Sequence, residues 1–590
     1  MILVFGGTTE GRKAAEALEE AGTPFFYSTR SDEQKLELVN GIHLTGGMEV
    51  SEMTAFCHAH DIRLLVDAAH PFATQLHANL LLAAGQTHLP IVRYERIYPP
   101  HDDTIVWCED YDDAVRKLES QCIERLLALT GVNTIPLLSD YWRKYECWWR
   151  ILNREASRKM ALKEGFPADR LVYYDESDTG KLMEQLHPQA ILTKESGVSG
   201  GFEEKVRAAK AMGVKVFAVQ RPAYPPVNIP TNHVRIKYVN GPHGLRRMVE
   251  RLLPDFYPLH SGLTTGTCAT GAAVAATLRL LYGKMPKEVP VVLPDGETIT
   301  VDVAYGEDYA AVVKEAGDDP DVTNGLEIRA SVEPSDTFCI LGGEGVGVFT
   351  LPGFDFPPGS PAINKAPRQM IYDNLKPLGE HFRVTLSVPQ GAEIAQRTFN
   401  PRLGIVRGIS IIGVSGIVKP FSEEAFIDSI RKCMEVAKAS GSETVVINSG
   451  AKSERYVKAQ FPELPRQAFV EYGNYIGETL KIAEEMGFPH VVLGVMLGKA
   501  VKLAAGHLDT HSRKSVMDKS FICRLLEEAG CRIDIEEIAL ARELWEKIPP
   551  DKARDFAKVV IRHCAHHCSP LLGKSTLTIF LIDDEGNIYE

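Results

Sequence analysis

The sequence predicts an α/β protein of several domains, and three observations support that prediction. With 590 residues, the chain is longer than one hydrophobic core usually organises. Over roughly the first 250 residues, short apolar runs alternate with helix-like segments, which is the pattern of a mostly parallel, doubly wound sheet of the Rossmann-like type. Farther along, a mixed α+β stretch gives way to a second α/β region.

The composition is typical of a reduced, water-soluble protein. Hydrophobic residues make up 44% and charged residues 24%, and no apolar run approaches the ~18 residues that a membrane span needs. The start at Met1 lacks the basic flank and cleavage site of a signal peptide, so we expect a cytoplasmic protein. Eleven scattered cysteines indicate free thiols. The net charge of -13 argues against a nucleic-acid partner, and a polyanionic ligand would need local Arg and Lys clusters.

The first region is expected to hold seven strands with helices between them. Gly22 and Gly213 are stop signals for two helices, which we expect at 12–20 and 202–212. In a doubly wound fold, ligands bind beyond the carboxyl ends of the strands. The residues that follow each strand are therefore the candidates. The expected strands are Ile2–Phe5, Phe25–Ser28, Arg63–Asp67, Arg125–Leu129, Leu171–Tyr174, Ala190–Thr193 and Lys215–Val219.

A glycine-rich turn, Gly-Gly-Thr-Thr-Glu-Gly-Arg, follows the first expected strand. Its glycines let the backbone approach a pyrophosphate, and the next helix offers unsatisfied N–H groups, to which threonine hydroxyls add donors. The alternative is a tight strand-to-helix turn without a ligand, since the spacing departs from G-x-G-x-x-G. The candidate cofactor contacts are Gly6, Gly7, Thr8, Thr9, Gly11 and Arg12.

Three further strand ends carry candidate contacts. Arg30 follows the second strand, where it would receive a 2′-phosphate and favour NADPH, or remain a solvated surface charge. His70 lies in the block Asp-Ala-Ala-His-Pro-Phe-Ala and is a candidate for a ligand or proton role, against a capping or packing role. Thr130 and Gly131 follow a mid-chain strand and are candidate cofactor contacts.

Two later strands end at basic residues. Lys194 opens a flexible loop that includes Ser196, and Arg221 follows the next strand. Lysine and arginine at such positions are candidate anchors for the carboxylates of a substrate.

These blocks, taken together, resemble precorrin-6A reductase of corrinoid biosynthesis over roughly residues 1–250. The residues that carry the resemblance are the opening turn, the Asp-Ala-Ala-His-Pro-Phe-Ala block, the mid-chain Thr-Gly, and Lys-Glu-Ser-Gly followed by Val-Phe-Ala-Val-Gln-Arg-Pro. The resemblance implies hydride transfer from NADH or NADPH to one double bond of a tetrapyrrole, with a proton added to the neighbouring carbon. Family members differ over the nicotinamide, so Arg30 does not decide it. We expect this region to span 1–252 in two lobes.

A second enzyme region is expected after a boundary at 251–260, where two prolines interrupt the alternation; the linker itself is placed at 253–260. A Thr- and Gly-rich loop follows and runs into a small-residue helix at 269–281. Thr264, Thr265 and Thr267 offer donors at this helix start, which is typical of an anion site. The alternative is an ordinary hydroxyl cap with a close-packed alanine helix.

The second half carries two more glycine loops. Gly342, Gly343 and Gly345 suit backbone contact with a flat ligand, or a plain turn between strands. An expected strand at 408–412 leads to Gly413-Val414-Ser415-Gly416 and to a helix capped by Ser422. Strands are expected at 444–447 and 490–495, the latter ending in a long loop to His507.

These blocks in this order resemble the cobalt-precorrin-5B C1-methyltransferase family over about residues 258–590. The resemblance implies S-adenosylmethionine as donor and a ring carbon of a cobalt-containing tetrapyrrole as acceptor. It also implies an α+β domain at 261–400 and an α/β domain at 401–590, with cofactor contacts at Gly342, Gly343, Gly345, Gly413, Ser415 and Gly416. Val414 departs from the family, in which we expect a threonine.

The two resemblances support each other, because the product of the methyltransferase family is the substrate of the reductase family. The acetate and propionate arms of such a substrate need cations, although each candidate could equally be a surface charge. His511 is the candidate for any general base in the methyltransferase half. The candidate cations are Arg368, Lys419, Lys499 and Lys502.

Two alternative functions stay open. One half of the chain could be inactive, with the altered loop at Val414 pointing to the methyltransferase half, or the protein could be a non-catalytic scaffold that binds cofactors and tetrapyrroles. The cluster His-Cys-Ala-His-His-Cys at 563–568 has soft ligands but is read as a helix end, so we expect packing and no metal. A homo-oligomer is compatible with the sequence.

Overall fold

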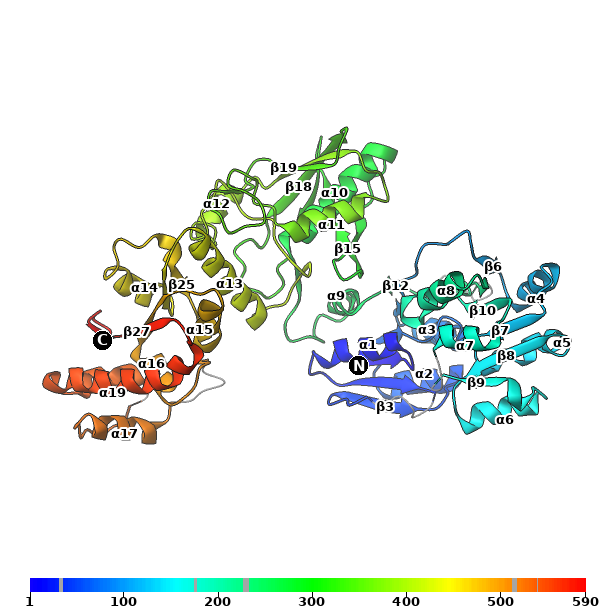
Figure 1. The fold of residues 1–590 in the computed structure, drawn as a ribbon, viewed down its shortest axis with the longest axis horizontal. Coiled ribbons are helices and arrows are strands. Elements are labelled where there is room, and N and C mark those ends of the chain that lie inside the picture. The colour runs from blue at the N-terminus through cyan, green and yellow to red at the C-terminus, as the bar shows by residue number, and fades with distance from the viewer. Residues whose placement is uncertain (31–35, 175–177, 227–232, 512–516, 539) are drawn as a thin grey trace. The chain divides into compact units, whose positions relative to one another are not determined.

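The computed structural model describes residues 1–590 except 31–35, 175–177, 227–232, 512–516 and 539 (Figure 1). The chain divides into two compact units. Unit 1 comprises Met1–His260 and Val292–Thr300, and unit 2 comprises Ser261–Val291 and Val301–Glu590. No helix among the described residues has both the length and the apolar character that crossing a bilayer requires.

Unit 1 contains two six-stranded sheets, each forming one lobe. The first has the order β12-β5-β4-β1-β2-β3, and all its strand pairs are parallel. Alternate residues of β1 face opposite sides, so that Ile2 packs in the core with α1 and α9 while Leu3 packs in the core with α2 and α3. The elements are β1 Ile2–Phe5, α1 Thr9–Glu19, β2 Phe25–Thr29, β3 Gly41–Thr45, α2 Val50–Ala59, β4 Leu64–Asp67, α3 Thr74–Thr87, β5 Ile91–Tyr94, β12 Ile236–Val239 and α9 Pro242–Leu252.

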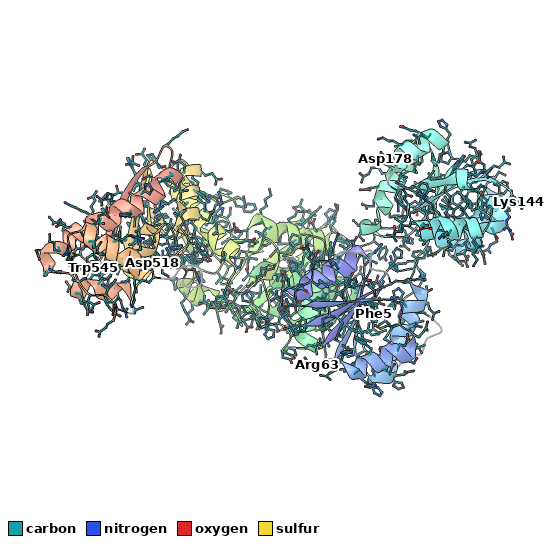
Figure 2. The ribbon with its side chains drawn as sticks, turned by 90° about the horizontal axis from the view of Figure 1, so that it is seen from below. Phe5, Arg63, Lys144, Asp178, Asp518 and Trp545 are labelled. Carbon is teal, nitrogen blue, oxygen red and sulfur yellow. The ribbon has the colours of Figure 1, made fainter. Side chains whose placement is uncertain are left out.

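The second lobe has the order β6-β11-β10-β7-β8-β9 and is also parallel throughout. Figure 2 labels Phe5 and Arg63 on the first lobe, and Lys144 and Asp178 on the second. The elements are β6 Val106–Cys108, α4 Tyr111–Ser120, β7 Arg125–Ala128, α5 Ser139–Trp142, β8 Glu146–Ile151, α6 Glu155–Lys163, β9 Leu171–Tyr173, α7 Thr179–Leu186, β10 Ala190–Lys194, α8 Phe202–Ala211 and β11 Lys215–Val219.

The expected doubly wound, Rossmann-like fold is confirmed in this region. All seven expected strands are present, and none differs by more than one residue at either end. Five strands were not expected from the sequence: β3, β5, β6, β8 and β12. Several of them, such as β3, are half-exposed sheet edges whose residues lack a continuous apolar run.

The first helix of unit 2 is α10, Thr265–Tyr282, which starts four residues earlier than expected. It packs on a mixed sheet of order β16-β17-β18-β21-β19, in which only the β19–β21 pair is parallel. The elements are β13 Gly262–Leu263, β14 Glu288–Val292, β15 Thr298–Asp302, β16 Ala304–Tyr305, β17 Ala310–Val313, β18 Glu327–Pro334, β19 Cys339–Gly342, β20 Val348–Phe349, α11 Lys365–Leu375, β21 Phe382–Ser387, α12 Gly391–Ile394, β22 Ile405–Val406 and β23 Ile417–Val418. The segment from the end of β14 to the first part of β15, Val292–Thr300, belongs to unit 1.

The rest of unit 2 is an α/β sheet of order β25-β24-β26-β27-β28, parallel except for β28. Its largest core cluster lies between this sheet and the helices α13, α15, α16, α17 and α19. The elements are α13 Glu423–Ala439, β24 Thr444–Asn448, α14 Ala451–Lys458, β25 Phe469–Glu471, α15 Ile476–Glu485, β26 His490–Met496, α16 Leu497–Ala504, α17 Lys519–Glu528, α18 Leu544–Lys547, α19 Pro550–Cys568, β27 Thr576–Ile582 and β28 Ile588–Tyr589.

Two expectations for unit 2 were wrong. The strand expected at 408–412 is reduced to isolated bridges at Ile409 and Ile411. The long loop expected after β26 is instead the helix α16. Leu497, Ala500 and Val501 are buried at helical spacing, so the apolar face of this segment provides the free energy that orders it as a helix.

Candidate functional site

The glycine-rich turn between β1 and α1 is tightly packed but open to solvent at Gly7. Thr8 caps α1, where its hydroxyl accepts a hydrogen bond from the Gly11 N–H at 3.0 Å and donates to the Ala68 carbonyl at 2.8 Å. A Cβ atom on Gly11 would lie 2.6 Å from the Gly6 Cα, so only glycine allows helix and strand to approach this closely. Gly7 and Arg12 are exposed and Thr9 is half-buried, which leaves this helix start accessible to a ligand.

A buried ion pair joins the start of α1 to the second lobe. Glu10 accepts a hydrogen bond from the Arg96 Nε–H at 2.9 Å, and both side chains are more than nine-tenths buried. Arg96 also donates to the Ser196 carbonyl at 2.7 Å, and Ser199 donates to the other oxygen of Glu10. Through Ser196 and Ser199, this pair is linked to the second lobe.

A second buried network surrounds Asp67 at the carboxyl end of β4. Arg93 donates to Asp67 at 2.9 Å, and His77 Nδ1 lies 2.7 Å from the other carboxylate oxygen. Although burial alone would raise the pKa of Asp67, the Arg93 charge and the contacts with His77 hold it below its usual value. Asp67 itself is fully buried, so its role is to orient Arg93 and His77.

His70 lies above this network. Its carbonyl lies 3.0 Å from His77 Nε2, and its own Nδ1 accepts from the Phe72 N–H at 3.2 Å. Burial and the nearby charges of Arg96 and Lys194 lower the pKa of His70 to about 3. The imidazole is therefore neutral near pH 7, which removes it as a strong acid while leaving a role in ligand contact.

A cavity of about 440 Å³ opens beside these residues in unit 1. Three arginines line it, namely Arg93, Arg96 and Arg221, together with Tyr98 and Tyr224. Arg221 lies over the Tyr98 ring at 3.6 Å and donates to Glu195 at 3.1 Å. Arginine forks over aromatic rings suit a ligand that is both flat and rich in carboxylates.

The cavity residues Arg93, Arg96 and Tyr224 were not found by reading the sequence. Arg93 lies in β5 and Arg96 just after it, and β5 itself was not expected because its apolar run is short. Three charged residues directly after an apolar run, Arg93, Glu95 and Arg96, were the signal that could have placed them.

The remaining expected contacts in unit 1 have different surroundings. Arg30 is exposed at the end of β2. Thr130 is buried, and its hydroxyl lies 2.6 Å from that of Thr134. Gly131 has a positive φ of 81° and its carbonyl accepts from the Trp149 indole. These interactions order the turn after β7, and a role in cofactor binding stays a prediction.

The start of α10 in unit 2 is covered by the loop at 410–416. Thr265 donates to the Ser410 carbonyl at 3.1 Å, and Thr267 donates to the Gly416 carbonyl at 2.6 Å. Thr264 caps the helix through the Thr267 N–H, and all three threonines are buried. The hydroxyls that we expected to bind an anion thus hold the loop at 410–416, so the structure favours the alternative of a capped, close-packed helix.

The loop at 413–416 itself is more accessible. Ser415 is exposed and donates to the Ile417 carbonyl at 3.0 Å, and Val414 is 77% exposed. A Cβ atom on Gly413 would lie 2.3 Å from the Thr264 hydroxyl, so glycine is needed for contact with α10. Gly416 is buried, and Lys419 beyond it is exposed.

The glycine run at 342–347 also contains both exposed and tightly packed glycines. Gly342 is exposed at the end of β19, whereas Gly345 is buried and a Cβ atom there would lie 1.8 Å from the Val388 carbonyl. The Gly343 N–H donates to the Leu386 carbonyl at 2.7 Å. Arg368 donates to the Ile363 carbonyl at 2.8 Å, and burial lowers its pKa. Gly345 and Arg368 thus have structural partners of their own.

The basic residues of α16 lie near His511. Lys502 donates to the Thr510 carbonyl at 3.3 Å, and the His511 N–H donates to the Asp509 carboxylate at 3.0 Å. Lys499 donates to the Gly473 carbonyl, and burial lowers its pKa. The structure thus brings Lys499, Lys502 and the 509–511 turn to one end of the C-terminal sheet.

The cysteines and histidines at 563–568 do not converge. They lie in the last turns of α19, where Cys564 and Cys568 face the core and Cys564 donates to the Ala500 carbonyl. His563 points to Glu528, with 2.7 Å between Nε2 and the carboxylate. Their placement therefore agrees with packing.

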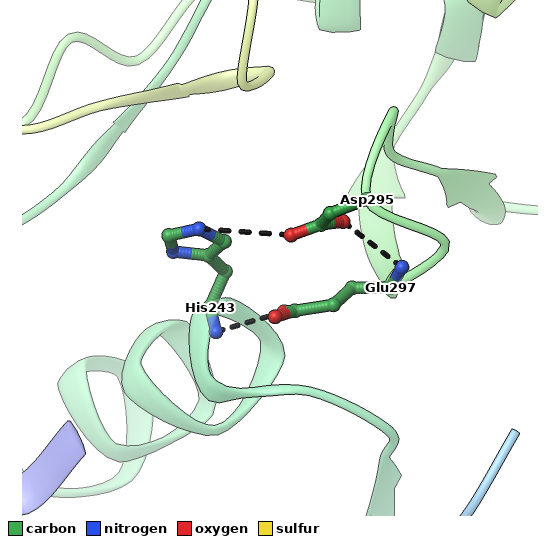
Figure 3. A group of neighbouring side chains, drawn as sticks. All are labelled: His243, Asp295 and Glu297. Carbon is green, nitrogen blue, oxygen red and sulfur yellow. Dashed lines mark hydrogen bonds and ion pairs between the residues drawn. The ribbon is translucent and has the colours of Figure 1, made fainter. Parts of the chain in front are cut away.

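In unit 1, three side chains of the kinds that bind metal ions lie close together (Figure 3). His243, Asp295 and Glu297 have ligand atoms within 4.8 Å of one another, the one such group in the part of the chain that the structure describes. Glu297 accepts from the His243 N–H at 2.9 Å at the start of α9. Burial and the neighbouring Asp295 raise the pKa of Glu297 to about 7. The carboxylate thus has a structural partner, the helix end, without a metal.

Comparison with known proteins finds different families along the two halves of the chain. Residues 1–238 match the family described as precorrin-6x reductase CbiJ/CobK, 255–420 match CbiD, and 509–589 match the C-terminal domain of CbiD. A cobalt-precorrin-5B C(1)-methyltransferase of Prosthecochloris aestuarii is 42% identical over 331 residues, covering 52% of this chain and 90% of that protein.

Two further likenesses are found. A protein of the same name from Geobacillus sp. is 38% identical over 52% of this chain and 88% of its own length. A solved structure titled CobK precorrin-6A reductase is 21% identical, covers 44% of this chain and 98% of that chain, and has a TM-score of 0.36.

Proposed function

Because this chain belongs to the cobalt-precorrin-5B C(1)-methyltransferase family and carries a precorrin-6x reductase region ahead of it, we propose that it is a bifunctional enzyme of cobalamin biosynthesis. Its C-terminal part would methylate C1 of cobalt-precorrin-5B to give cobalt-precorrin-6A. Its N-terminal part would reduce that product to cobalt-precorrin-6B. The observation that carries the proposal is the presence in one chain of two family regions whose reactions are consecutive.

The arginine-lined cavity supports the reductase half. A tetrapyrrole with acetate and propionate arms is flat and polyanionic, and the protein as a whole is acidic. Local cations must therefore hold it. Arg221 is exposed at the cavity, where its guanidinium group can meet a substrate carboxylate, and Tyr98 and Tyr224 offer flat surfaces beside it. Arg93 also lines the cavity but is buried in its ion pairs with Asp67 and Glu95.

The nicotinamide cofactor, NADH or NADPH, would bind at the carboxyl edge of the first sheet. The accessible start of α1 suits its pyrophosphate, with Gly7, Thr9 and Arg12 within reach. Arg30 lies at the end of the neighbouring strand β2, where it would contact a 2′-phosphate. When bound, this cofactor supplies the hydride. The protein must place the macrocycle over it and exclude water.

Methyl transfer from S-adenosylmethionine needs alignment of donor and acceptor more than acid–base help. In unit 2 the exposed candidates for this work are Gly342, Ser415 and Lys419. The cations Lys499 and Lys502 are half-buried candidates. Thr264, Thr265 and Thr267 would act indirectly, by fixing the 410–416 loop. We propose His511 as a base only if the acceptor carbon must lose a proton first.

A cytoplasmic location and a homo-oligomeric state are part of the same proposal and rest on the sequence alone. Two alternative functions are kept beside it. In one, only one half of the chain is active; in the other, the protein is a scaffold that binds cofactors without turnover. The buried hydroxyls at α10 do not favour an inactive methyltransferase half, because they order a loop whose surface stays open.

The test is an anaerobic incubation of the purified protein with cobalt-precorrin-5B, S-adenosylmethionine and either NADPH or NADH, followed by mass spectrometry of the tetrapyrrole. We expect a gain of one methyl group and then of two hydrogens. Methylation without reduction would leave only the methyltransferase assignment. Binding of each cofactor without any change in the tetrapyrrole would favour the scaffold.

A further inference from the structure

The C-terminal sheet of unit 2 reverses its strand order between β24 and β26. From β24 the chain passes through α14 to β25 on one side, and then through α15 to β26 on the other side of β24. Val457 of α14 and Leu480 of α15 belong to different core clusters, on opposite faces of the sheet. In open parallel sheets, ligands bind at the carboxyl ends of the strands where the strand order reverses. The carboxyl ends of β24 and β26 therefore mark a ligand position that the glycine motifs of the sequence did not indicate.

The loop that follows β24 is built around a glycine. Asn448 ends the strand, is fully buried, and accepts a hydrogen bond from the Gly450 N–H through its side-chain oxygen at 3.1 Å. Gly450 has a φ of 141°, a conformation that favours glycine. Because glycine has no side chain, it cannot cap α14, and the first N–H groups of that helix are left for other acceptors.

A carboxylate lies directly beside this glycine. Glu471 is the last residue of β25 and pairs in register with Asn448. A Cβ atom on Gly450 would lie 3.2 Å from Oε1 of Glu471, so the glycine leaves space that a side chain would fill. The Glu471 side chain is 28% exposed, and no hydrogen bond to its carboxylate is found among the residues that the structure describes. Its ion-pair partner Arg402 is 3.9 Å away and is engaged with Glu454 at 2.7 Å.

A carboxylate with free acceptor capacity at the end of this strand suits the sugar of a nucleoside. In doubly wound nucleotide-binding folds, an acidic residue about 20 residues beyond the first loop accepts hydrogen bonds from ribose hydroxyls. Glu471 follows Asn448 by 23 residues. The proposed methyl donor, S-adenosylmethionine, is an adenosine derivative and carries this sugar. At the other glycine loops of unit 2, Gly345 and Gly413 are instead packed against protein atoms.

Resting on the methyltransferase half of the proposed function, we propose that S-adenosylmethionine binds at the carboxyl ends of β24, β25 and β26. Glu471 accepts hydrogen bonds from the ribose hydroxyls, since an ionised carboxylate only accepts. Gly450 lets the loop after β24 lie against the nucleoside. The exposed loop at 413–416 is then left for contact with the tetrapyrrole.

The first experiment measures binding of S-adenosylhomocysteine to the full chain by isothermal titration calorimetry, without tetrapyrrole or nicotinamide. Glu471→Ala should weaken binding about 10- to 100-fold, the range for losing hydrogen bonds to a charged group. The matched control is Glu443→Ala, because Glu443 is exposed at the amino end of β24, at the opposite edge of the same sheet. The control should bind like the wild type, and equal urea midpoints would show that both variants fold.

The 2′-deoxy analogue of S-adenosylhomocysteine tests the contact itself. The wild type should bind this analogue more weakly than the ribose compound, because one donor to Glu471 is missing. Glu471→Ala should bind the two compounds alike. A residue that only supports the fold would weaken both compounds and leave their ratio unchanged.

Hydrogen–deuterium exchange locates the site without any substitution. In the wild-type chain, S-adenosylhomocysteine should slow amide exchange at 449–453 and 471–474 and leave exchange at 413–416 unchanged. These two segments are far apart in the sequence, but Gly450 and Glu471 bring them together at the edge of the sheet.

Three results would overturn the assignment. Protection confined to 342–347 or 413–416 would place the cofactor at the glycine loops. Unchanged affinity in Glu471→Ala would remove this carboxylate from the site. A preference for ribose that persists in Glu471→Ala, or is absent in the wild type, would remove it from the sugar. If the wild-type chain bound neither S-adenosylmethionine nor S-adenosylhomocysteine, the methyltransferase function on which the assignment rests would fail instead.

Discussion

The starts of α1 and α10 look alike in the sequence and differ in the structure. Each follows a short strand, carries glycines and threonines, and offers the N–H groups of a first helical turn. At α1 the glycine turn is exposed at Gly7. At α10 the Gly266 N–H donates to the Ile412 carbonyl, and Thr267 donates to Gly416.

The difference lies in what the rest of the chain brings to each helix start. At α10, carbonyl oxygens of the 410–416 loop accept hydrogen bonds from the N–H and hydroxyl groups of the first helical turn. At α1 the second lobe arrives with Ser196 and Ser199, which engage the Arg96–Glu10 pair beside the turn and leave the turn open. A third helix start, that of α9, is capped by the Glu297 carboxylate. A motif thus predicts donors, and tertiary structure decides what they bind.

The largest effect is expected from breaking the pair beside the open helix start. Arg96→Met leaves Glu10 buried without its partner and should cost about 3–5 kcal/mol of unit 1 stability, with loss of reduction. Methyl transfer by the same protein serves as an internal standard. In the control Arg63→Met, the pair with Asp255 is exposed to solvent, so its loss should change stability little. Equal urea midpoints for the two variants would contradict the role of the buried pair.

The next effect tests whether the open turn depends on glycine. Gly11→Ala places a Cβ atom 2.6 Å from the Gly6 Cα, so α1 must move away from β1. We expect a loss of about 1–3 kcal/mol and weaker NAD(P)H binding, measured by nicotinamide fluorescence. Gly47→Ala, where nothing lies within 4 Å, is the control in the same lobe. Unchanged NAD(P)H affinity in Gly11→Ala would contradict cofactor binding at this turn.

At the closed helix start, Thr267→Val should act through the loop. It removes the buried donor to the Gly416 carbonyl at a cost of about 1–3 kcal/mol and should lower methyl transfer while reduction of supplied cobalt-precorrin-6A continues. Thr277→Val is matched, because that residue is equally buried in α10 but its hydroxyl donates only to Ala273 of its own helix. If both variants methylate alike, the loop does not need this anchor.

A further effect is a pH dependence of stability at the capped start of α9. Burial raises the pKa of Glu297 to about 7, above its ordinary value of 4.5, so the folded state prefers the protonated form. This contribution to stability is complete below about pH 4.5 and is lost as the pH rises through about 7, with a slope of at most about 1.4 kcal/mol per pH unit. Urea unfolding of wild type and Glu297→Gln between pH 4.5 and 7.5 measures it. A constant difference between the two would contradict the shift.

Much of this architecture was predictable, and the gaps have a common cause. Buried parallel strands such as β1 and β4 are continuous apolar runs and were placed to within one residue. Half-exposed edge strands such as β3 have no such run. The helix α16 was missed because its Gly and Lys residues resemble a loop, while its apolar face shows only against the core.

For the site, the sequence identified residue types but not their partners. It indicated His70 and Lys194 as candidates, yet the low pKa of the former depends on cations from elsewhere in the chain. Arg93 and Arg96 depend on β5 for their position and could not be placed without it. Spatial convergence of distant strand ends is the information that a single sequence lacks.

The strand β12 has a consequence for how the protein is made. It completes the first sheet beside β5, although about 140 residues and the whole second lobe separate the two strands along the chain. During synthesis the ribosome therefore releases a finished second lobe while the first still waits for its edge strand and for α9. A product truncated before Ile236 would expose the edge of β5, so nascent chains stalled there should be the ones that chaperones and proteases engage.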